Sequence, residues 1–145
     1  MSKIRQFICV SRQILGVLWQ LPQFLIGWAL GRVYRRAESV AVGEYEGVEV
    51  VFSSWMPGGL ALGNVIIVSY RYLKVKGLAA AKRVQAHEFG HCRQSRLLGW
   101  LYLPVIGLPS LCWAAARRCS KRLREIDYYG FYTERWADRL GGVER

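Results

Sequence analysis

Two long uncharged runs constrain the fold of this 145-residue chain more than any other feature of its sequence. The first covers residues 13–31 (QILGVLWQLPQFLIGWALG), and the second covers residues 97–116 (LLGWLYLPVIGLPSLCWAAA). A helix of about 20 apolar residues crosses the hydrocarbon core of a bilayer, so each run is long enough to be a membrane segment. The remaining chain is short, and we expect one compact domain with a modest core.

The charge distribution favours contact with an anionic surface. The chain has 21 basic and 10 acidic residues, a formal net charge of +11. Arg12 and Arg32 bracket the first run, and Arg96 and Arg117 bracket the second. Basic residues at the edges of apolar segments are typical of flanks that meet anionic lipid. The basic tract 117–124 (RRCSKRLR) also raises nucleic acid as a partner, but no nucleic-acid-binding motif accompanies it, so we predict none.

We predict that residues 1–36 form an N-terminal membrane anchor helix. Arg12 interrupts the apolar core that a cleaved signal peptide needs, so we expect the anchor to stay uncleaved. Gln20, Pro22 and Gln23 weaken the middle of the run, which leaves open a spanning helix, a helix on the membrane surface and a helix packed on the domain. Basic residues precede and follow the run alike, and they therefore predict no sidedness.

Between and after the runs, the pattern is that of a small sheet followed by helices. Residues 40–72 are rich in Val, Ile and Tyr and are punctuated by Gly, which predicts short strands joined by tight turns. Residues 77–96 and the amphipathic segment that ends at Gly141 have helical patterns, so the fold class is α+β. The cysteines show no disulfide-framework spacing, and we expect free thiols in a reducing compartment. They are Cys9, Cys92, Cys112 and Cys119.

The predicted helix contains the pattern HEFGH, and His87 and His91 are the only histidines in the chain. Residues four apart share a face of a helix, so both imidazoles can bind one Zn²⁺ at about 2.0–2.1 Å. Glu88 lies on the adjoining edge, where it can accept a proton from the attacking water. The alternative is a pair of surface histidines on an ordinary helix.

A catalytic zinc site needs a third protein ligand, which must here be Asp, Glu or Cys. Glu134 and Asp138 are four apart on a predicted helix, so both face one way. One could bind the metal while the other anchors a ligand imidazole through its second nitrogen. Cys92 directly follows His91 and therefore points about 100° away from it on the helix, which disfavours it as a ligand.

HEFGH followed by a helix that bears ERWAD resembles the gluzincin metallopeptidases, and most of all their membrane-bound CAAX-prenyl and heat-shock endopeptidases. The resemblance implies zinc on His87, His91 and Glu134. It also implies Glu88 as general base and Asp138 as the partner of a ligand histidine. It covers two short motifs. The chain is much shorter than that family and lacks its full set of membrane helices, so no substrate is carried over.

The resemblance extends to the stretch GGLALGNVIIVSY. Gluzincins bind an extended peptide on an edge strand above the active-site helix, and residues 63–69 resemble that strand. An ordinary sheet strand is the alternative. The substrate-binding residues that this implies are Gly63, Asn64, Val65, Ile66 and Ile67.

The ligands also constrain the second uncharged run, because it lies between His91 and Glu134. A straight helix of this length spans about 30 Å and would put Glu134 beyond the bilayer, and the charged segment that follows could not cross back. Pro104 and Gly107 lie at the middle of the run. We therefore predict that residues 97–116 form a short helical hairpin, which dips into one leaflet or packs beneath the domain.

Taken together, the patterns predict a minimal zincin-like domain over residues 37–145. It has a small sheet, an active-site helix and a C-terminal glutamate helix, and the anchor and the hairpin associate it with a membrane. The expected activity is peptide-bond hydrolysis with Zn²⁺, on a peptide or protein substrate, and it requires a donor for the oxyanion. Tyr128, Tyr129 and Tyr132 lie near the glutamate helix, where the sequence favours core packing for them over the role of donor. A non-catalytic membrane protein with a structural zinc site and a basic lipid-binding or adaptor module stay open as alternatives.

Overall fold

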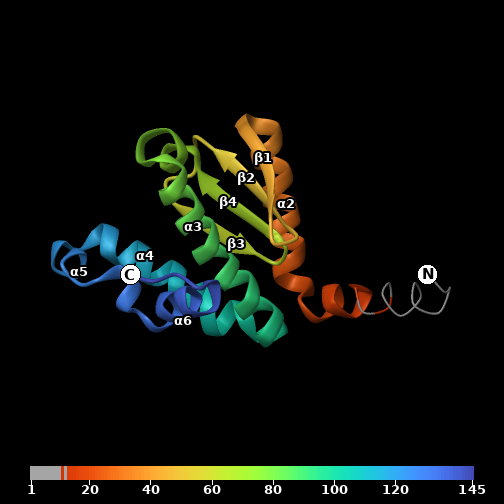
Figure 1. Cartoon of the computed structure of the whole chain (residues 1–145). Coiled ribbons are helices and arrows are strands. Elements are labelled where there is room, and N and C mark those ends of the chain that lie inside the picture. The colour runs from red at the N-terminus through yellow and green to blue at the C-terminus, as the bar shows by residue number, and fades with distance from the viewer. Residues whose placement is uncertain (1–10, 12) are drawn as a thin grey trace.

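The computed structural model describes residues 11 and 13–145, and the predicted α+β class is confirmed. Its centre is a four-stranded mixed sheet in the order β1–β2–β4–β3 (Figure 1). The central strands β2 and β4 are parallel, while β1 and β3 pair antiparallel with them at the two edges. The bounds are β1 Ser39–Tyr45, β2 Val48–Ser53, β3 Gly59–Leu62 and β4 Val65–Ser69.

Helices cover both faces of the sheet. Successive side chains of a strand point to opposite faces, so the neighbours Ile66 and Ile67 belong to different core clusters. Helix α2 (Leu21–Glu38) packs on the cluster of Ile67, and α3 (Tyr70–Leu98) inserts Phe89 into the cluster of Ile66. The sheet is therefore the middle of three layers, and α3 is the layer that bears the HEFGH pattern.

The first uncharged run is docked on this domain. Gln23 is fully buried in α2, and its amide donates to Ser95 Oγ (3.1 Å) and to the Gly99 carbonyl (2.7 Å). Ser95 Oγ in turn donates to Gln20 Oε1 (2.8 Å). The glutamines that weaken the run as a membrane span are thus bonded to the end of α3, 72 to 76 residues away for Gln23.

Within the described residues, no single helix combines the length and apolarity of a membrane span. The helices Gln13–Trp19 and Leu21–Ala37 meet that standard of length and composition only as a pair, and they are bent by 93°. Residues 1–10 and 12, which belong to the predicted anchor and include Cys9, lie outside the described residues. In the described part, Cys92, Cys112 and Cys119 are free thiols.

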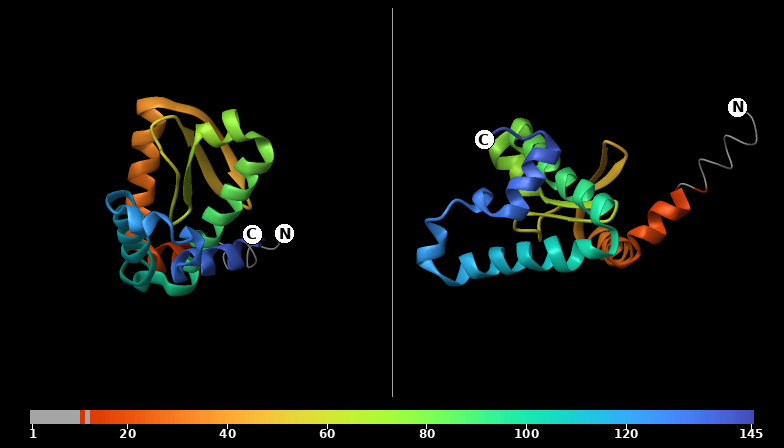
Figure 2. Two further views of the ribbon diagram at one scale, coloured as in Figure 1. Left: turned by 90° about the vertical axis from the view of Figure 1, so that its left-hand side faces the viewer. Right: turned by 90° about the horizontal axis from the view of Figure 1, so that it is seen from below.

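The predicted hairpin at 97–116 is wrong. The chain reverses at Gly99, whose φ is 56°, and then continues as η1 (Gly99–Leu101), a π-helical turn η2 (Leu103–Gly107) and α4 (Leu108–Cys119). The junction residues Tyr102, Gly107 and Leu108 all have right-handed helical backbone angles. Residues 102–119 therefore form one helical rod, which is seen at full length in the right-hand view of Figure 2.

The prolines do not break this rod because of where they stand. Pro104 lies in the first turn of the rod, where the missing N–H loses no intrahelical bond. Pro109 lies inside the rod just after the π-helical turn, and the Val105 carbonyl that its missing N–H leaves free accepts a hydrogen bond from the Tyr132 hydroxyl (2.6 Å). Gly107 permits a turn but does not impose one. The chain instead returns through α5 (Lys121–Arg124) and η3 (Tyr128–Gly130) to α6 (Tyr132–Gly141), which brings Glu134 back to α3.

The predicted edge strand is also misplaced. Val65, Ile66 and Ile67 belong to β4, whose two edges are occupied by β2 and β3, and Gly63 and Asn64 form the turn that precedes it. A continuous run of β-branched residues is typical of a strand buried on both faces, which is an interior strand. The edge strand beside the HEFGH helix is β3.

Candidate metal centre

Helices α3 and α6 approach closely, and glycines make this possible. A Cβ on Gly90 would collide with the carbonyl of Ala137 in α6, and a Cβ on Gly141 would collide with the carbonyl of Ala86 in α3. The seam between these helices brings His87, His91 and Glu134 together, and all three are buried.

The three side chains present one ligand atom each to a common point. His87 Nε2 lies 3.2 Å and His91 Nε2 lies 3.5 Å from Glu134 Oε2, and all three atoms are within 4.8 Å of one another. Tetrahedral ligands with bonds of about 2.0–2.1 Å lie about 3.3 Å apart, which matches these two separations. The group could therefore hold a metal ion.

The atoms that do not face this point are held by other side chains. His87 Nδ1 lies 2.6 Å from Asp138 Oδ1, and His91 Nδ1 lies 2.7 Å from Gln94 Oε1. Such bonds fix which imidazole nitrogen carries the proton, and here they leave both Nε2 atoms free to bind a cation. Asp138 thus makes the contact that the sequence predicted for it, with His87.

Glu134 is held in the same way. Its Oε1 accepts hydrogen bonds from Ser110 Oγ (2.5 Å) and Thr133 Oγ1 (2.9 Å), which leaves Oε2 facing the histidines. The sequence predictions missed Gln94, Ser110 and Thr133. Gln94 lies three residues after His91, so helical spacing could have found it. Ser110 has no local signal, because it belongs to the uncharged run.

Neighbouring charges and hydrogen bonds shift the pKa values of His87 and Glu134 in opposite directions. Burial lowers the pKa of His87, but its hydrogen bonds with Glu134 and Asp138 and the charge of Glu88 outweigh burial and raise the pKa to about 9. Burial alone would raise the pKa of Glu134, whereas the hydrogen bonds from His87 and His91 lower it well below its ordinary value.

Glu88 and its neighbour His87 both line a cleft. The cleft has a volume of about 960 Å³ and is bounded by residues 56–60, α3, α4 and η3. Gly59 of β3 lies against the Glu88 carboxylate so closely that a Cβ there would overlap Oε1. Burial raises the pKa of Glu88 above its ordinary value, against the lowering effect of His87 and His91 beside it.

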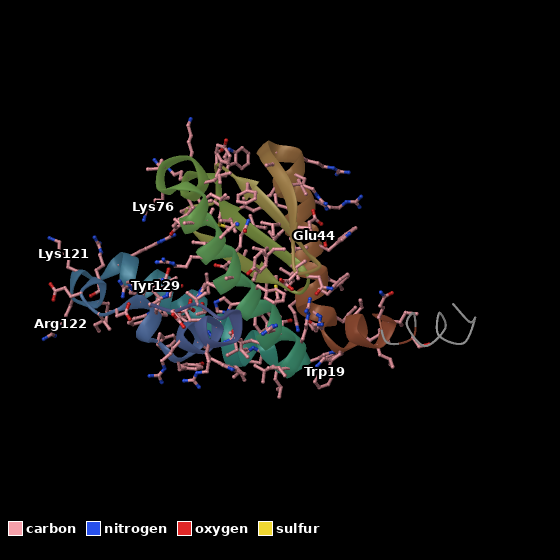
Figure 3. The ribbon with its side chains drawn as sticks, in the orientation of Figure 1. Trp19, Glu44, Lys76, Lys121, Arg122 and Tyr129 are labelled. Carbon is pink, nitrogen blue, oxygen red and sulfur yellow. The ribbon has the colours of Figure 1, made fainter. Side chains whose placement is uncertain are left out.

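Two of the three predicted tyrosines line the same cleft. Burial raises the pKa of Tyr128 above its ordinary value, so its hydroxyl stays protonated and able to donate. The rings of Tyr129 and His87 form a T-shaped pair with their centroids 5.3 Å apart, and Tyr129 is labelled in Figure 3. Tyr132 does not line the cleft, because its hydroxyl donates to the Val105 carbonyl (2.6 Å).

The predicted substrate-binding residues 63–67 do not line the cleft, whose strand wall is residues 56–60 instead. No protein-family model matches this sequence, and no curated protein and no solved structure matches the chain. The proposed function therefore rests on the geometry and chemistry of the described residues.

Proposed function

We propose that this chain is a zinc-dependent metallopeptidase of gluzincin type, with His87, His91 and Glu134 as ligands and Glu88 as general base. The observation that supports this most is the arrangement of the candidate ligands and Glu88 in the site. Three candidate ligand atoms converge in the α3–α6 seam, and the buried Glu88 lines a cleft that the candidate ligand His87 also borders. Two imidazoles and one carboxylate are a donor set that zinc takes in catalytic sites.

Zinc bound there supplies a Lewis acid that polarises the scissile carbonyl and lowers the pKa of water. Glu88 takes the proton of the attacking water and delivers it to the leaving amine. The Tyr128 hydroxyl donates a hydrogen bond to the oxygen on which negative charge develops. A structural zinc site needs neither an open cleft nor a buried carboxylate beside the ligands.

The substrate chain pairs with β3 at Gly59. Ser69 N donates to the Gly58 carbonyl, so the backbone groups of Gly58 face β4 and those of Gly59 face the free edge. The next outward carbonyl, that of Ala61, already accepts a hydrogen bond from the Tyr102 hydroxyl (3.2 Å). Pairing with an extended peptide is therefore limited to the position beside Glu88, which places the scissile bond there.

The test is peptide hydrolysis by the purified full chain in detergent, read by mass spectrometry of a mixed peptide pool. We expect one zinc per chain in the wild type and in Glu88→Gln, and a loss of turnover of about 10²–10⁴-fold in Glu88→Gln, the range for removal of a general base. Glu144→Gln is the matched control, because Glu144 is exposed near α6, and it should behave as wild type.

Two outcomes would contradict the proposal. One zinc per chain with no wild-type turnover would favour the structural zinc site, because the metal would then serve the fold alone. Absence of stoichiometric zinc would favour the basic lipid-binding or adaptor module.

A further inference from the structure

Large apolar side chains are exposed along one face of the molecule. In the right-hand view of Figure 2, helix Gln13–Trp19, the end of α2 and the rod 102–119 lie along one side, and α6 and the C-terminus lie on the opposite side. We call six residues of these segments and of η1 the apolar face, and the side chain of each is more than half exposed. They are Leu15, Leu18, Trp19, Trp100, Leu101 and Leu108.

The apolar face is continuous across two distant parts of the chain. The Trp19 indole donates to the Arg96 carbonyl (3.0 Å), and the Trp100 indole donates to the Leu18 carbonyl (2.9 Å). Figure 3 shows Trp19 at this corner, where the N-terminal helix meets the end of α3. Each indole N–H is thus bonded within the protein while the ring stays exposed. Such a ring can enter hydrocarbon without leaving a buried donor unsatisfied.

The same segments direct their polar groups inward. Gln20, Gln23 and Ser95 are buried and bonded to one another and to Gly99, directly behind the apolar face. A helix docked on a water-soluble domain normally has the reverse arrangement, with its apolar stripe inside and its polar side chains outside. The medium that suits the outer surface of these segments is therefore less polar than water.

The charges beside the apolar face identify the medium as anionic. Residues 13–37 and 96–124 contain no Asp or Glu, in a chain with a net charge of +11. Arg32 lies one helical turn after Trp28 on α2 and stacks over its ring at 4.7 Å. Around the end of α4, Arg118, Lys121 and Arg122 are exposed. Long basic side chains at the ends of exposed apolar stripes can reach lipid phosphates while their stems cover apolar surface.

We propose that the apolar face inserts into one leaflet of an anionic bilayer, with the domain lying on the membrane surface. Helix α2 keeps its place on the sheet in this arrangement, because the Gln23 bonds and the Ile67 cluster hold it there. The apolar face takes up lipid tails, and the flanking arginines contact phosphate groups. This proposal rests on surface residues alone and does not depend on the peptidase proposal.

The test is flotation of the full chain with two kinds of vesicle, phosphatidylcholine alone and phosphatidylcholine mixed with phosphatidylglycerol. We expect tighter binding to the anionic vesicles, weakened by salt. The double variant Leu101→Glu, Leu108→Glu should lower binding by at least about tenfold, because two apolar contacts become charged. The matched control is Val75→Glu, Leu78→Glu, which changes two exposed apolar residues beside Lys76, at the far end of α3 in Figure 3.

Circular dichroism and zinc content verify that both double variants are folded. Glu88→Gln and Glu134→Ala change the candidate metal centre and should bind vesicles as the wild type does. Failure of the peptidase proposal would therefore leave the vesicle result unchanged. Equal losses in the two double variants, or no binding by the wild type, would overturn the proposal. A lipid-free dimer that Leu101→Glu, Leu108→Glu converts to a monomer, with no vesicle binding, would assign the apolar face to a second copy of the chain. Resistance to extraction by alkali would indicate a spanning segment and would overturn the surface arrangement.

Discussion

The metal centre and the apolar face are adjacent regions with opposite relations to their surroundings. At the centre, five ionisable side chains are buried against one another: His87, Glu88, His91, Glu134 and Asp138. On the apolar face, leucines and tryptophans are exposed. Soluble proteins normally show the reverse of both distributions. We therefore expect each region to be completed by a partner of matching chemistry, a cation at the first and lipid at the second.

One helix serves both regions through consecutive residues. Gln94 and Ser95 are both fully buried in α3, yet they point to different sides of it. Gln94 bonds to His91 and to the Thr133 carbonyl, whereas Ser95 bonds to Gln20 and Gln23. Separate substitutions can therefore perturb the start of α2 and the candidate metal centre, although both contact the end of α3.

The substitution with the largest expected effect lowers zinc affinity at the candidate metal centre, and a substitution on the apolar face should not. Glu134→Ala removes one of three ligands and should weaken zinc binding by more than about a hundredfold, since losing even a side chain that supports a ligand costs 10–100-fold. Zinc affinity is measured by competition with a chelator. Leu108→Glu is the control on the rod and should leave zinc affinity unchanged. Full zinc retention in Glu134→Ala would reopen the identity of the third ligand.

A second, smaller effect concerns the metal centre alone. His87 has a raised pKa of about 9 in the metal-free protein, and zinc binds only its neutral form. Binding at lower pH must therefore release a proton, and the affinity should fall about tenfold for each pH unit below 9. Chelator competition over a pH series, or proton release in buffers of different ionisation enthalpy, measures this. A flat affinity between pH 7 and 9 would show that His87 is neutral before zinc arrives.

Local spacing explains what the sequence could predict of the site. His87 and His91, and likewise Glu134 and Asp138, are four apart, so a helix places each pair on one face whatever the rest of the fold does. The HEFGH motif and the Glu134 and Asp138 pair come together if the chain returns to the first helix after the second uncharged run. The return route itself was not predictable, because Pro104 and Gly107 allow a turn and also fit the rod that the chain forms.

Long-range contacts explain what the sequence could not predict. Gln23 appeared only as a weak point in an apolar run, since its partners Ser95 and Gly99 are more than 70 residues away. The resemblance predicts an edge strand at residues 63–69, and nothing in the pattern of this segment shows that β3 covers it. The α+β class was predictable because the periodicities of strands and helices are local.

The smallest expected effect tests the hydrogen bonds that hold the start of α2 against the end of α3. Gln23→Ala removes the donor to the Gly99 carbonyl and to Ser95, and it leaves buried groups unsatisfied, so the free energy of unfolding should fall by about 2 kcal/mol. Urea denaturation followed by circular dichroism measures this, with Gln13→Ala as the control, because Gln13 is exposed on the same run. The folded Gln23→Ala protein should still bind one zinc, since Ser95 and Gln94 act on different sides of α3. Unchanged stability would mean that these bonds do not hold the run against the domain, and the apolar face would lose its support. Zinc loss from folded Gln23→Ala would instead show that the two regions are coupled through the end of α3.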